Sequence, residues 1–165
     1  MASTTVFRGS DGTLSVAVES GPAGDRAKAI AEQYSLTPVG RATGVTVRVT
    51  NDVQPFHELG QRFPTELRPG NVNVHGTIER AYINGALLRL MLGDASDSRP
   101  AGTFVGPSFN LSLQLLNPAT PDVTASVTVM GVQLNEWSYS LPEDDYVMEQ
   151  VSFRALWIKT EEAGA

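Results

Sequence analysis

The chain contains no cysteine, and this absence removes three classes of chemistry at once. Without thiols it can form no disulfide framework, no thiolate metal site and no cysteine nucleophile. Lysine is scarce too, since only Lys28 and Lys159 accompany ten arginines. Eighteen acidic residues against twelve basic ones give a net charge of −6. The chain as a whole therefore lacks the basic footprint of a nucleic-acid-binding protein.

Long apolar runs are also missing. No run reaches the ~18 residues that a membrane-spanning helix needs, so we expect no membrane association. The first residues, MASTTVFRGSDG, lack the basic-then-apolar layout of a secretion signal. We expect a protein made and kept in a cytoplasm, or released from one by lysis. Its 165 residues fit a single domain, 1–165, that buries its own core.

Motifs for catalysis and metal binding are few. The sequence has no phosphate-binding glycine loop, no dinucleotide fingerprint and no nucleophile elbow. His57 and His75 have no second histidine at ligand spacing, which argues against a metal site. The acidic run 143–145 could bind a cation or a partner's arginines, or be a solvated turn. We predict no enzymatic activity, no cofactor and no metal.

Apolar and polar residues alternate with a period of two along most of the chain. This alternation predicts half-buried antiparallel strands and a mainly β fold. We expect strands over 13–18, 45–50, 72–79, 109–115, 123–129, 132–137 and 147–158, with a break at Gly131.

Two segments have helical spacing instead. In the first, Asp25 is a suitable N-cap, and an apolar stripe follows at residues 27, 30, 31 and 34. In the second, Asn84 can cap a helix over about 84–93 that Gly93 ends. The second helix is apolar almost all round, so we expect it to be buried.

The connection over 51–70 is unusually long for a compact domain. It contains three prolines and several large apolar side chains. Those side chains need a surface to cover them, and a neighbouring subunit is one candidate. The candidate inter-subunit residues are Phe56, Leu59, Arg62 and Phe63.

The polar faces of the predicted strands carry small uncharged residues rather than the usual Lys and Glu. One interpretation is an ordinary sandwich surface of low charge. The other is a sheet whose edges pair with copies of itself, because charged residues that normally protect edges are missing. Closing such a sheet into a ring would remove its exposed edges and leave one face around a wet interior.

Several stretches together resemble a known family. They are an alternating strand at 44–50, ELGQRF at 58–63, GTIERAYINGALLRLMLG at 76–93, GVQLNEWSYSL at 131–141 and VSFRA at 151–155. Over roughly residues 40–160, the chain resembles the major tail tube proteins of tailed bacteriophages and the related inner tubes of contractile injection systems.

The resemblance implies an antiparallel β-sandwich or half-barrel with a flanking helix. Six subunits would merge their strands into a ring-shaped barrel, and stacked rings would form the virion's tail tube. The expected partners are further copies of the chain, with sheath, tape measure, baseplate and terminator proteins. DNA would pass through without specific binding, and the family has no catalytic residues to carry over.

On this hypothesis, the polar faces of three strands line the channel. The candidate lumen-facing residues are Asn73, His75, Thr77, Glu79, Asn110, Ser112, Gln114, Thr124, Ser126 and Thr128. The main alternative is the inner tube subunit of a bacterial contractile injection system or phage-like bacteriocin. A ligand-binding β-sandwich would need clustered exposed aromatics, and an enzyme would need a convergent polar site.

Overall fold

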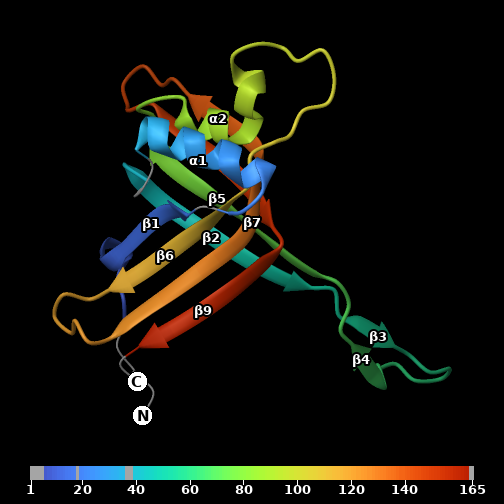
Figure 1. The fold of residues 1–165 in the computed structure, drawn as a ribbon. Helices are drawn as coiled ribbons and strands as arrows, with labels where there is room; N and C mark the ends of the chain where they lie inside the picture. Colours follow the sequence, from blue (N-terminus) through green and yellow to red (C-terminus); the bar gives the residue numbers. More distant parts are fainter. Residues whose placement is uncertain (1–5, 18, 36–38, 164–165) are drawn as a thin grey trace.

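A strongly bent antiparallel sheet dominates the computed structural model, which describes residues 6–17, 19–35 and 39–163 (Figure 1). The strand order is β1–β6–β7–β8–β5–β2, and β9 also pairs with β7. Their bounds are β1 Gly12–Ala17, β2 Ala42–Asn51, β5 Val72–Ala81, β6 Phe109–Leu116, β7 Thr124–Ser140, β8 Met148–Ala155 and β9 Trp157–Ala163. The prediction of a mainly β half-barrel with a flanking helix is confirmed.

The long strand β7 joins two halves of this sheet. Its residues 124–132 pair with β6 and β9, and together with β1 these form what we call the A half. Its residues 133–140 pair with β8, and with β5 and β2 these form the B half. The predicted break at Gly131 is therefore a bend within one strand, and the predicted last strand is two strands, β8 and β9, that meet at Leu156.

Gly131 makes the bend between the halves. Its φ of 67° lies in the left-handed region, which glycine adopts without a Cβ penalty. Two residues of β7 face one of β6 here, because Phe109 pairs with Val132 and Leu111 pairs with Val129. The unpaired Gly131 N–H donates to the Asn110 side-chain oxygen at 3.1 Å. This side-chain hydrogen bond replaces the one that the sheet cannot supply at the bend.

Two helices lie side by side over one end of the bent sheet (Figure 1). The first, α1 (Pro22–Tyr34), begins at Gly21 with Pro22 in its first turn, so the prediction of Asp25 as N-cap was wrong. Proline suits that position because its fixed φ is helical and its missing N–H is not needed there. The second, α2 (Ala86–Leu92), ends at Gly93 as predicted and continues into a short 3-10 turn, Gly93–Ser96.

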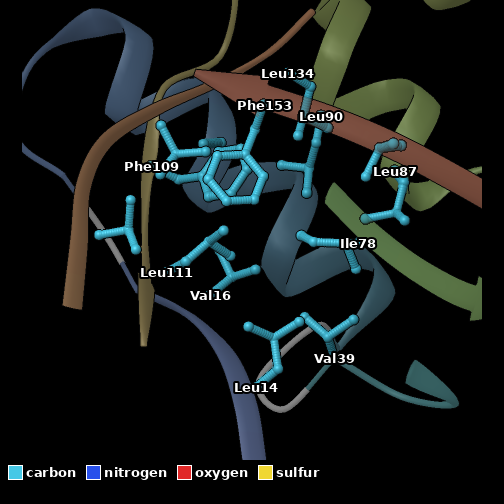
Figure 2. Close-up of a cluster of buried hydrophobic side chains, with 14 of the residues drawn as sticks. Leu14, Val16, Val39, Ile78, Leu87, Leu90, Phe109, Leu111, Leu134 and Phe153 are labelled. Carbon is cyan, nitrogen blue, oxygen red and sulfur yellow. The ribbon is translucent and has the colours of Figure 1, made fainter. Parts of the chain in front are cut away.

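The core lies between the two halves and beneath the helices. Figure 2 shows side chains from the A half, the B half and α2 meeting in one cluster. Phe109 and Leu111 come from the A half, Phe153 comes from the B half, and Leu90 comes from α2. The predicted burial of α2 is confirmed for Ala86, Leu87 and Leu90, and the apolar stripe of α1 packs against the same cluster. The predicted strand residue Val18 lies outside the described residues.

Candidate functional site

The outer face of the B half is polar and is ordered in rows across its four strands. The register aligns Arg48 of β2, His75 of β5, Arg154 of β8 and Gln133 of β7, which we call the arginine row. On one side of it lies the pair Thr50 and Asn73. On the other side lie a row of Thr46, Thr77, Ser152 and Glu136 and a row of Gly44, Glu79, Gln150 and Ser138.

This face is hollowed into a broad open groove of about 710 Å³. Its lining contains Arg48, His75, Arg154 and the hydroxyl and amide side chains around them. Arg48 and Arg154 are exposed, and His75 is half-buried. Sequence reasoning singled out His75 but missed both arginines, because only the strand register shows that they flank it.

The ten candidate lumen-facing residues divide between two surfaces. Asn73, His75, Thr77 and Glu79 lie together on the outer face of the B half. The other six lie on the outer face of the A half, where the register aligns Ser112 with Thr128 and Gln114 with Ser126. The core separates the two faces, so they point to different sides of the molecule. Asn110 is in addition occupied by its hydrogen bond to Gly131.

The B half ends in two strands that have room for another partner. Among the described residues, β2 pairs only with β5, and residues 133–140 of β7 pair only with β8. Arg48 is the one charged residue of β2, and Glu136 is the one charged residue of 133–140. Neither strand has the lysine or proline that usually prevents edge pairing. In contrast, the edge strand β9 carries Lys159, Glu161 and Glu162.

The 51–70 connection is an arm that projects from one end of the B half (Figure 1). Near its ends it forms a two-stranded hairpin of β3 (Gln54–Phe56) and β4 (Glu66–Arg68), so the predicted long connection contains strand structure that the sequence analysis did not predict. All of residues 51–70 are exposed, including the four candidate inter-subunit residues. Leu59 is 105% exposed and Phe63 is 83% exposed. Side chains this apolar on a projecting arm form a surface of the kind that a partner covers.

A buried ion pair supports the B half from the core side. The Arg80 guanidinium on β5 bonds the Glu149 carboxylate on β8, and both side chains are 0% exposed. Trp137 of β7 donates its indole N–H to Glu149 at 2.9 Å. Arg80 also donates to the Asn84 side-chain oxygen at 3.1 Å, and that oxygen accepts the Ala86 N–H at the start of α2. The network therefore connects three strands and one helix. The sequence did not predict this network because the pairing of its residues depends on cross-strand register.

The end of the B half opposite the arm carries tyrosines and acidic residues. Tyr82 stacks on Tyr139 with ring centroids 5.6 Å apart. The acidic run 143–145 lies in the exposed turn between β7 and β8. Within the described ranges, no three His, Asp or Glu side chains gather as a metal site would require, and no helix is long and apolar enough to cross a membrane.

Comparisons with known proteins identify the fold. No family model and no curated protein matches the sequence. The sheath/tube terminator of the extracellular contractile injection system PVC matches with a TM-score of 0.62 at 13% identity, over 97% of this chain and 99% of that one. The PVC sheath–tube complex matches with a TM-score of 0.61 at 13% identity, over 98% of this chain and 94% of that one. The SPP1 tail tube matches with a TM-score of 0.60 at 11% identity, over 97% of this chain and 80% of that one. The chain therefore has the tail tube fold, as its sequence motifs predicted.

Proposed function

We propose that this chain is a structural subunit that assembles with itself into stacked six-membered rings, which form the tube of a phage tail. The observation that carries the proposal is the B half, a four-stranded unit with an unprotected edge on each side. Its strands alternate in direction, so β2 of one copy can pair antiparallel with residues 133–140 of β7 in the next. Repeating that pairing closes a barrel and satisfies both free edges.

The polar outer face of the B half would line the channel of this barrel. The outer face of the A half points to another side of the molecule, so the proposal assigns to the lumen only Asn73, His75, Thr77 and Glu79 of the ten candidates. The other six lie outside the channel. The core and both helices then surround the barrel from outside.

The arm accounts for stacking. It leaves one end of the B half and exposes Phe56, Leu59 and Phe63, together with Arg62. Docked on a neighbouring copy, these side chains would be removed from the water that surrounds them in the isolated chain. The tube would conduct DNA during ejection and would meet sheath, tape measure, baseplate and terminator proteins in the tail.

Electron microscopy of the purified full-length chain tests the proposal. Rings or hollow filaments are expected, and stable monomers at high concentration would contradict it. Thr46→Lys combined with Ser138→Lys places like charges on the two facing edges and should stop ring closure. Thr13→Lys combined with Thr160→Lys makes the same chemical change on the edge strands β1 and β9. This control should assemble like the unmodified chain.

The alternative function is the inner tube of a bacterial contractile injection system or phage-like bacteriocin. It is favoured by the similarity to the PVC sheath–tube complex. Both functions use the same ring, so assembly alone does not separate them. Capsid and terminase genes beside the coding gene would favour a virus, and their absence would favour an injection device.

A further inference from the structure

The arginine row places two permanent positive charges on a hollowed face of a chain whose net charge is negative. Arg48 and Arg154 are the cross-strand neighbours of His75 on its two sides. Arginine stays ionised at every physiological pH. The three side chains therefore form one band of cationic or ionisable groups across adjacent strands, within the groove of about 710 Å³.

Neither arginine is neutralised by the rest of the described chain. Across residues 6–17, 19–35 and 39–163, Arg48 and Arg154 form no ion pair and no side-chain hydrogen bond, whereas six other cations are paired with carboxylates. The acidic residues of this face, Glu79 and Glu136, lie in other rows. Arg48 lies on β2 and Arg154 on β8, with β5 between them, so both guanidinium groups are open to an external anion.

The surroundings of the row fit a phosphate backbone better than a peptide. Arginine's planar fork matches phosphate oxygens, and Ser, Thr, Asn and Gln side chains are the usual additional donors to phosphates. Those residue types flank the row, at Thr46, Thr50, Asn73 and Ser152. An acidic polypeptide would gain specificity from apolar or aromatic pockets for its side chains. Of the apolar residues that line the groove, Val74 and Phe153 are buried in the core, and the register places hydroxyl, amide and charged side chains on the outer face.

We infer that the arginine row is a contact band for the phosphodiester backbone of nucleic acid. The inference rests on the proposed function for one step only, the repetition of the row around a channel. There it would form a single cationic belt between rows of hydroxyl and amide groups. Such a belt holds DNA weakly and without sequence preference, because each subunit contributes only two permanent charges and salt competes with them.

The test compares Arg48→Gln combined with Arg154→Gln against a matched control, Lys28→Gln combined with Arg99→Gln. Both double variants lower the net charge by the same amount, and Lys28 and Arg99 are exposed residues outside the groove. A labelled 20-base-pair DNA duplex is titrated with each full-length protein, and fluorescence anisotropy is followed over a series of salt concentrations. Electron microscopy of the same samples records assembly.

The groove variant should bind the duplex about tenfold or more weakly at low salt. The slope of log affinity against log salt should fall by ~0.9 for each phosphate that the protein no longer neutralises, which is up to ~1.8 for each subunit in contact with the duplex. The control variant should keep the affinity and the salt slope of the unmodified chain. Equal binding by the groove variant and the unmodified chain would overturn the inference. Displacement of the duplex by polyglutamate, added at the same concentration of negative charge, would also overturn it. Failure of the unmodified chain to form rings contradicts the proposed function instead, so the two failures are distinguishable.

Discussion

One border of the A half differs from both borders of the B half. The A half ends in β1, which has no charged residue, and in β9, where Lys159, Glu161 and Glu162 lie along the edge. The B half ends in β2 and in residues 133–140 of β7, with one charged residue on each. Charged edges resist pairing with other strands, and uncharged edges permit it. Under the proposed function, both edges of the B half are completed by neighbouring copies, whereas the charged β9 edge of the A half stays exposed to water.

The largest loss of stability should come from removing the buried carboxylate of the B half. Glu149→Ala leaves the Arg80 guanidinium buried without its anionic partner, which typically costs about 3–5 kcal/mol. We expect that loss in the free energy of unfolding, measured by urea denaturation. Glu66→Ala removes an exposed pair with Arg68 and should change stability by about 0.5 kcal/mol or less. Equal losses in the two variants would contradict the structural role of the buried pair.

The next largest effect should come from the bend between the halves. In Gly131→Ala, the new Cβ would lie 2.7 Å from the Leu156 side chain, on a residue whose φ is 67°. Strain of this kind costs on the order of 1–3 kcal/mol. Gly102→Ala adds a Cβ in open space and is the matched control for thermal unfolding. If both variants melted at the same temperature as the unmodified chain, the bend would not depend on glycine.

A smaller effect on stability, with a clear effect on association, should follow from neutralising the A half's edge. Replacing Lys159, Glu161 and Glu162 by serine removes exposed charges and one exposed ion pair. The free energy of unfolding should therefore change by about 1 kcal/mol or less. The edge would then resemble those of the B half. Light scattering should report irregular aggregates. Aggregation no greater than in the unmodified chain would show that charge does not protect β9.

The smallest effect on folding should come from the arm. Phe56→Ala combined with Phe63→Ala truncates two exposed side chains, so the free energy of unfolding should change by about 0.5 kcal/mol or less. Tube formation should nevertheless fall strongly in sedimentation assays. Thr120→Ala combined with Thr103→Ala offers a control on exposed connections away from the arm. A variant that unfolds readily would place the two phenylalanines inside the subunit instead.

Local patterns in the sequence predicted much of the fold. Alternation located most strands of the large sheet, and it did so most clearly for strands with one buried face, such as β5. The apolar run ending at Gly93 located α2. The start of α1 was predicted wrongly because Asp25 is a strong cap by composition, whereas Gly21 and Pro22 give the chain its actual entry geometry. The passage of β7 through Gly131 was missed because the bend depends on the Asn110 hydrogen bond, which comes from another strand.

The candidate site was only partly predictable, for a related reason. Which face a residue occupies follows from its position in its own strand, but which residues share a row follows from register. His75 was therefore identified while Arg48 and Arg154 were not. The division of the ten lumen candidates between two faces also depends on how the sheet bends around its core. No pattern within a single strand encodes that bend.

The arm leaves the B half at one end only, and the stacked tyrosines with the acidic turn occupy the other. A subunit whose two ends differ has a structural polarity. Copies joined end to end in one orientation make a filament whose two tips are chemically different. Different proteins can then bind the two tips, so such a filament can be started at one tip and closed at the other.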